Sequence, residues 1–77
     1  MHHALKCKVE YFEAVIRGKK KFELRKNDRN FQPKDTFILI EVEKGISTGR
    51  ISAMLEIQYV FKGGEYGLEP DYCIFNW

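Results

Sequence analysis

The chain has 77 residues, of which 44% are hydrophobic and 31% are charged, so its composition is that of one small globular domain spanning residues 1–77 and not of a disordered segment. It has no apolar run near the roughly 20 residues that a membrane helix needs and no apolar signal core, so we expect a cytosolic protein that binds no membrane. Two cysteines, Cys7 and Cys73, are too few for a disulfide framework, and we expect both to be reduced packing residues.

The net charge of +2 is unevenly distributed along the chain. Residues 17–34 contain eight lysines and arginines but two acids, which gives this segment a charge of +6 and leaves −4 for the rest. A positive region of this kind attracts phosphate groups. Nucleic acid is therefore the first partner that the sequence predicts.

The first predicted elements are a strand and a helix. Residues 2–8 alternate apolar side chains with polar or charged ones, as a half-buried strand does. From Val9 to Ile16 the apolar residues recur at helical spacing, which predicts a short amphipathic helix. Gly18 can adopt the left-handed backbone conformation that ends a helix.

Beyond this glycine the apolar residues alternate with charged ones, which predicts a second strand. Phe22 and Leu24 share one side of it, which we expect to be the core side. Glu23 and Arg25 then lie together on the other, open side. Residues 26–34 are polar and rich in turn-forming residues, and they predict a loop.

Three more strands follow. Thr36 to Val42 is dense in β-branched and aromatic residues, as a buried strand is, and residues 44–49 form a connection. In residues 51–61 apolar and polar side chains alternate over about twice the usual strand length. This strand should therefore bend, as strands do in small closed sheets. Residues 63–70 form a glycine-rich loop before a final strand over residues 72–77.

These elements predict one α+β domain. Because so short a chain encloses an interior only if its strands curve around it, we expect a small β-barrel of about five strands. One short helix after the first strand plugs or flanks the barrel.

Three charged residues form the candidate binding cluster. Glu23 and Arg25 are two residues apart on a strand and project from the same face, and Lys20 comes just before them. Lysine and arginine can bind an anion, while a carboxylate accepts hydrogen bonds from a base or a sugar. A structural ion pair between Glu23 and Arg25 is the alternative interpretation.

A longer signature is complete in this chain, because Gly-x-Lys-x-x-Glu-x-Arg is formed by Gly18, Lys20, Glu23 and Arg25. Further matching segments are His3-x-Leu5-Lys6, Tyr11-Phe12, Glu23 to Arg29 and Gly63 to Leu68. Through these segments, which cover nearly the whole chain, it resembles the ASCH domains (the activating-signal-cointegrator homology family), and within them a small bacterial and phage subgroup of mostly unknown function. The resemblance implies a barrel similar to that of the PUA RNA-binding domains. It also implies a cleft between the helix and the barrel in which the cluster meets nucleic acid or a nucleotide.

One branch of that superfamily consists of small amidohydrolases that act on acetylated cytidine with a lysine, a threonine and a glutamate. Lys20 matches the lysine of that branch. Glu23 stands where the threonine is expected, and a carboxylate cannot replace a hydroxyl nucleophile. The resemblance therefore favours a binding module over an enzyme.

We expect a module that binds RNA, or another nucleic acid or nucleotide, without a cofactor. Lys20 and Arg25 would contact phosphates, and Glu23 would accept hydrogen bonds from a base or a ribose. Metal ligation is not expected, because zinc needs three or four well-spaced ligands. The other candidate contact residues are Lys19, Lys26 and Arg29, which extend the positive field, and Tyr66, which can stack on a base or pack over its own loop.

Two other functions stay open at this point. One is a small nucleoside-processing amidohydrolase in which Lys20 acts as a base and Glu23 as its acid–base partner. The other is a protein-interaction adaptor. The basic run at residues 17–21 also has a purely structural interpretation as a solvated helix end. The sequence does not indicate an oligomeric state.

Overall fold

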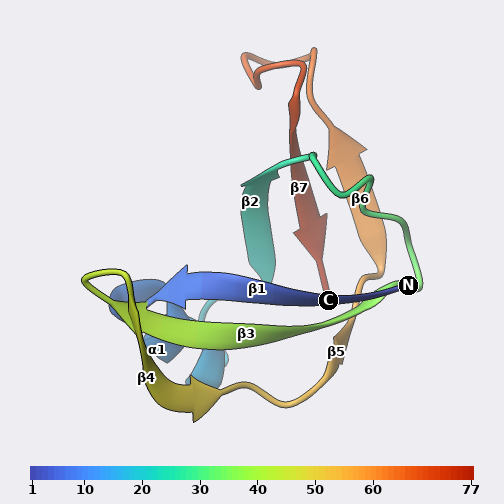
Figure 1. Ribbon diagram of the computed structural model, residues 1–77. Coiled ribbons are helices and arrows are strands. Elements are labelled where there is room, and N and C mark those ends of the chain that lie inside the picture. Colours follow the sequence, from blue (N-terminus) through green and yellow to red (C-terminus); the bar gives the residue numbers. More distant parts are fainter.

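The computed structural model describes residues 1–77 as seven strands and one helix, arranged in two sheets (Figure 1). In chain order the elements are β1 (His2–Lys8), α1 (Val9–Ile16), β2 (Phe22–Lys26), β3 (Thr36–Glu43), β4 (Ile46–Ile51), β5 (Leu55–Glu56), β6 (Tyr59–Lys62) and β7 (Tyr72–Asn76). The predicted α+β organisation is confirmed, with one short helix directly after the first strand. This helix has neither the length nor the apolar character to cross a membrane.

The first sheet is built around β3. β1 lies parallel to β3, from His2 opposite Thr36 to Lys8 opposite Val42, while β4 and β5 pair antiparallel with β3. Phe37 of β3 is fully buried, as expected for a central strand that is rich in β-branched and aromatic residues. The helix α1 packs against β1 and β3.

β3 and β4 form a hairpin that the sequence prediction missed. We expected a connection over residues 44–49, but β4 begins at Ile46. Lys44 and Gly45 have φ values of 50° and 79°, and such positive values at both central residues are what a two-residue hairpin turn requires. Because Lys44 replaces the usual Asn, Asp or Gly at the first position, the segment lacks the pattern by which such turns are predicted.

The second sheet is antiparallel and has β7 in the middle, between β2 and β6. Leu24 of β2 lies opposite Ile74 of β7, which lies opposite Phe61 of β6. Its strands run across the direction of β1 and β3 in Figure 1. The two sheets therefore cross instead of continuing into one another.

Residues 51–61 change sheet part-way. β4 ends at Ile51, β5 pairs with β3, and β6 pairs with β7. The change falls between β5 and β6, where the Ile57 N–H donates to the Asp35 carbonyl at 2.8 Å and the Gln58 N–H donates to the Asn76 carbonyl at 2.9 Å. The expected bend is confirmed, but a closed barrel is not. Seven strands form two sheets, and β1 and β2 each have one neighbouring strand.

Side chains from both sheets and from α1 pack into one core. Phe75 of β7 contacts the rings of Phe31 and Phe37, with centroid distances of 5.0 and 5.2 Å. Cys7 and Cys73 lie in this core as free thiols, as predicted, and burial raises the pKa of both. The nine buried hydrophobic residues are Leu5, Cys7, Phe12, Phe31, Phe37, Leu39, Ile57, Cys73 and Phe75.

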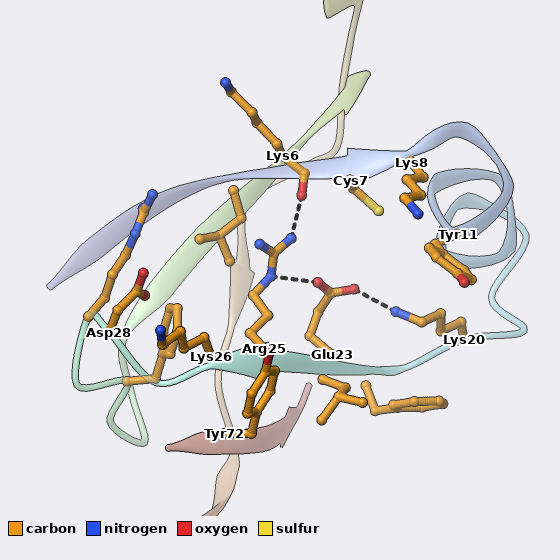
Figure 2. A pocket seen from close by; sticks show the side chains of 15 residues that line it. Lys6, Cys7, Lys8, Tyr11, Lys20, Glu23, Arg25, Lys26, Asp28 and Tyr72 are labelled. Carbon is orange, nitrogen blue, oxygen red and sulfur yellow. Dashed lines mark hydrogen bonds and ion pairs between the residues drawn. The ribbon is translucent and has the colours of Figure 1, made fainter. Parts of the chain in front are cut away.

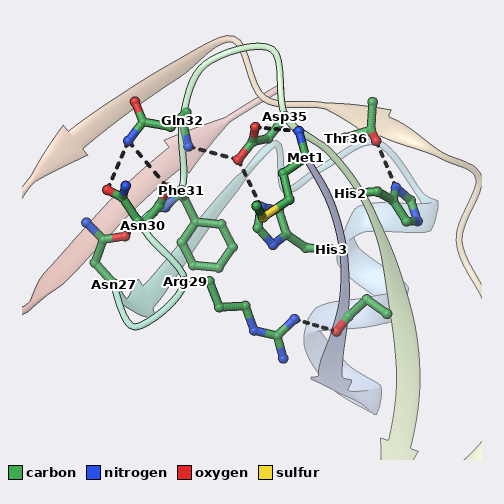
Figure 3. A network of polar contacts seen from close by, with 11 residues as sticks. Met1, His2, His3, Asn27, Arg29, Asn30, Phe31, Gln32, Asp35 and Thr36 are labelled. Carbon is green, nitrogen blue, oxygen red and sulfur yellow. Dashed lines mark hydrogen bonds and ion pairs between the residues drawn. The ribbon is translucent and has the colours of Figure 1, made fainter.

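The loop between β2 and β3 is fastened to the start of β1 (Figure 3). His3 Nε2 lies 2.9 Å from Asp35 Oδ2, and the Gln32 N–H donates to the same oxygen at 3.1 Å. Phe31 packs edge-on against the His3 ring, with a centroid distance of 4.7 Å, and its N–H donates to Asn27 Oδ1. Buried polar and aromatic contacts thus hold this predicted loop in one position.

Candidate functional site

The face of β2 that we expected to be buried is exposed, and the face that we expected to be open points to the interior. Glu23 is 4% exposed, whereas Phe22 and Leu24 are 49% and 54% exposed. Glu23 lies opposite the buried Phe75 of β7, and side chains of directly paired residues share a face of the sheet. The predicted alternation is correct, but its assignment to core and open sides was wrong.

The buried carboxylate of Glu23 is held by two cations (Figure 2). Lys20 Nζ donates to Glu23 Oε1 at 2.5 Å, and Arg25 Nε donates to Oε2 at 2.8 Å. A buried charge is tolerated only when it is paired and hydrogen-bonded, which explains why the charged side of β2 can face inward. The structure therefore brings Lys20, Glu23 and Arg25 together, although beside the core and not on an open surface.

Lys20 is also enclosed by aromatic rings. Its Nζ lies 5.0 Å from the centroid of the Phe22 ring and 5.7 Å from that of Tyr11. The electron-rich faces of these rings attract a cation. Lys20 is thus fixed in place by a carboxylate on one side and by π-faces on the other.

Arginine side chains bridge the gap between the two sheets. Arg25 Nη2 donates to the Lys6 carbonyl at 2.5 Å, and Arg29 Nη1 donates to the Ala4 carbonyl at 3.0 Å. Both carbonyls belong to β1, whose single partner strand is β3. Guanidinium groups therefore bind carbonyl groups along the edge of β1 that has no partner strand. We call the region between the facing edges of β1 and β2 the seam.

The seam contains a pocket of about 640 Å³. β1 contributes residues 5–8 and β2 contributes residues 22–26. Glu23 and Arg25 point from β2 toward β1, and the Lys8 side chain reaches into the same space (Figure 2). The remaining lining residues are Tyr11, Lys20, Asp28, Arg29, Phe31 and Tyr72.

The pocket is strongly positive for a chain of net charge +2. Its lining residues include two acids, Glu23 and Asp28, against six lysines and arginines, a formal excess of +4. The excess is +3 without Lys6, whose ammonium group points away from the pocket in Figure 2. The cations are Lys6, Lys8, Lys20, Arg25, Lys26 and Arg29.

Not all of the predicted site residues reach this pocket. Lys20, Glu23, Arg25, Lys26 and Arg29 line it. Lys19 and Tyr66 lie outside it. Lys19 is an exposed residue that follows the helix, and Tyr66 is 94% exposed.

Lys8, Tyr11 and Tyr72 also line the pocket and were missed by the sequence analysis. Lys8 had the lysine–apolar alternation of β1 as its signal and Tyr11 had the matching Tyr11-Phe12 segment, whereas no sequence pattern indicated Tyr72.

Cys7 is the one thiol in the pocket lining. Burial raises its pKa, and the nearby Glu23 carboxylate raises it further. A thiol with a raised pKa stays protonated at neutral pH, and the protonated form is a poor nucleophile. Cys7 is therefore a packing residue at the base of the pocket.

Residues 2–77 match the family described as a domain of unknown function, DUF3850. The chain belongs to this family. It is also similar to a protein of Escherichia phage P2 described as an uncharacterised 12.9 kDa protein in the GpA 3′ region, with 48% identity over 48 residues. These residues are 62% of this chain and 44% of the phage protein, so the match spans less than half of that relative. The ASCH resemblance depends on the signature residues and not on these matches.

Proposed function

We propose that the protein binds RNA, or another nucleic acid or nucleotide, in the seam pocket. The observation that carries this proposal is the formal excess of +3, counted without Lys6, in a pocket whose lining also includes Tyr11, Phe22 and Tyr72. Cations attract phosphates, and aromatic rings stack on bases. Nucleic acids combine these two chemistries in one ligand.

The arginines retain donors for phosphate oxygens. A guanidinium has five N–H groups, and Arg25 uses its Nε and Nη2 while Arg29 uses its Nη1. Both oxygens of Glu23 already accept hydrogen bonds from cations. We therefore assign to Glu23 the positioning of Lys20 and Arg25, in place of the direct contact with a base that the sequence suggested.

We also propose that the two sheets are an opened form of the PUA-like barrel that the signature implies. The seam lies where β1 and β2 would pair to close such a barrel, and arginine side chains bridge it. In this interpretation the open seam is the binding cleft.

The lining residues do not favour the amidohydrolase. No serine or threonine lines the pocket, and the thiol of Cys7 is kept protonated by burial. The ammonium of Lys20 is engaged by Glu23. The serine, threonine or thiolate nucleophile of covalent acyl transfer is therefore absent from this lining.

A titration of short labelled RNAs at low ionic strength tests the proposal. We expect binding that weakens steeply with salt, because each phosphate contact releases counterions. Lys8→Ala should weaken binding of all sequences and reduce the salt slope by about 1, since Lys8 reaches into the pocket. Lys44→Ala, on the β3–β4 hairpin outside this pocket, is the matched control. No binding at low salt would overturn the proposal.

A further inference from the structure

The second sheet leaves a face of large side chains uncovered. Directly paired residues of an antiparallel sheet share a face, so one row is Phe22, Asn76 and Tyr59, and the next is Leu24, Ile74 and Phe61. Tyr59 is 65% exposed. The exposed Asn76 lies between the exposed rings of Phe22 and Tyr59. We call this surface the outer face, and it ends with the pair formed by Lys26 and Tyr72.

The outer face is continuous with the seam pocket. β2 is an edge strand, and its outward residues line both surfaces. Phe22, Leu24, Lys26 and Tyr72 belong to the outer face and also to the lining of the pocket. A chain that leaves the pocket across β2 therefore meets aromatic rings next.

We propose that the outer face stacks the bases of a single-stranded nucleic acid whose phosphates lie in the seam pocket. This inference rests on the proposed function and narrows its ligand to single-stranded RNA or DNA. Every base has a π-face that an aromatic side chain can cover, whereas the bases of a duplex are stacked on each other and paired. A duplex could reach the cations of the pocket but not use the rings.

The spacing of the rings fits this ligand. Phe22 and Tyr59 are on strands separated by β7, and two strand spacings are about 10 Å. That separation is too wide for two rings to sandwich one base, so each ring would cover a different base. The amide of Asn76 lies between them and can donate to and accept from a base edge.

A second copy of this chain fits the outer face less well. Protein interfaces are depleted of lysine, and Lys26 lies on this face. A dimer would also bury the amide of Asn76 between two rings, where an unsatisfied polar group is unfavourable. Lys26 has one acid nearby, with Asp71 Oδ2 at 3.9 Å, so its charge is largely available to a phosphate.

Tyr59→Ala tests the inference, because Tyr59 is exposed and lies outside the pocket lining. Wild-type protein should bind a labelled single-stranded oligonucleotide more tightly than the same sequence as a duplex. Tyr59→Ala should weaken single-strand binding about tenfold, as the loss of one stacked base does, while Tyr59→Phe should keep it. Binding of tripolyphosphate, which reports on the pocket alone, should not change.

Ile46→Ala is the matched control, since Ile46 is an exposed apolar residue of the other sheet. If Tyr59→Ala binds the single strand as tightly as wild type, the inference is overturned while the proposed function stands. Failure of the wild type to bind any oligonucleotide overturns both. A concentration-dependent dimer in sedimentation that Tyr59→Ala abolishes would assign the face to a second copy instead.

Discussion

At the scale of single residues, Glu23 is a buried carboxylate whose charge is neutralised by two cations. Its carboxylate is removed from water, and the ammonium of Lys20 and the guanidinium of Arg25 offset the lost hydration. Removing one member of such a group leaves an uncompensated charge, which is more harmful than replacing the whole group. The stability of β2 therefore depends on all three residues together.

Glu23→Gln should lower the free energy of unfolding by about 3 kcal/mol, because Lys20 and Arg25 lose their negative partner in a partly desolvated site. Urea unfolding at neutral pH measures the change. Glu13→Gln is the matched control, since Glu13 pairs with Arg50 and Arg17 nearer to solvent and exposed pairs contribute little. Equal losses in the two variants would contradict the role assigned to Glu23.

The sequence predicts that Glu23 and Arg25 share a face, because alternation is a property of the strand itself. It does not predict which face is buried. The usual rule places Phe22 and Leu24 inside, and it fails here because cations from the same short segment neutralise the buried carboxylate. Such compensation depends on three-dimensional contacts that periodicity does not contain.

At the scale of elements, periodicity predicts β1, α1, β2, β3 and β7 close to their observed positions. Each is short and has one dominant period. The run over residues 51–61 differs, because one stretch of alternating residues serves two sheets. What divides it is a switch of backbone partner, because Ile57 donates to Asp35 beside β3 and Gln58 donates to Asn76 of β7, and no local pattern reports such contacts between distant residues.

The loop between β2 and β3 depends on one carboxylate, and this gives it a pH dependence. Burial raises the pKa of Asp35, but hydrogen bonds from His3, from the N-terminal amine and from the Gln32 N–H lower it by more, so the net shift is downward. A lowered pKa means that the ionised group stabilises the fold. That contribution is fully present above the ordinary pKa and is lost as the pH falls through the folded-state pKa.

Asp35→Asn should therefore be less stable than wild type at neutral pH, and the difference should shrink below about pH 4, the ordinary range of an aspartate. Thermal unfolding between neutral and acidic pH measures it. Asp28→Asn changes an exposed acid in the same loop, and its difference from wild type should vary much less with pH. A pH-independent difference for Asp35→Asn would contradict the assignment.

At the scale of the whole molecule, the seam is where the two sheets are least connected. No strand pairing joins β1 to β2, and Arg25 and Arg29 supply hydrogen bonds across the gap. The pocket exists because this edge is open. The sequence signature identifies Lys20, Glu23 and Arg25, but Lys8, Tyr11 and Tyr72 enter the pocket only because distant segments converge there.

Arg25→Lys should loosen the seam. A lysine ammonium can still neutralise Glu23, but it lacks the planar fork that reaches Glu23 and the Lys6 carbonyl together. Loss of one charge-assisted hydrogen bond corresponds to roughly tenfold faster local opening, which amide hydrogen exchange of β1 measures. Arg50→Lys, which changes an arginine outside the pocket lining, should leave β1 exchange unchanged. Unchanged exchange in Arg25→Lys would show that other contacts hold the seam.

The arginines of the seam also bear on how the protein behaves at high concentration. An unpaired strand edge offers carbonyl and N–H groups to any other extended chain, and such edges are common starting points for aggregation. In β1 the carbonyls of Ala4 and Lys6 are already occupied by guanidinium groups, and lysines alternate along the same strand. Both features oppose the docking of a foreign strand, so the edge stays open to a ligand while it resists pairing with a second polypeptide.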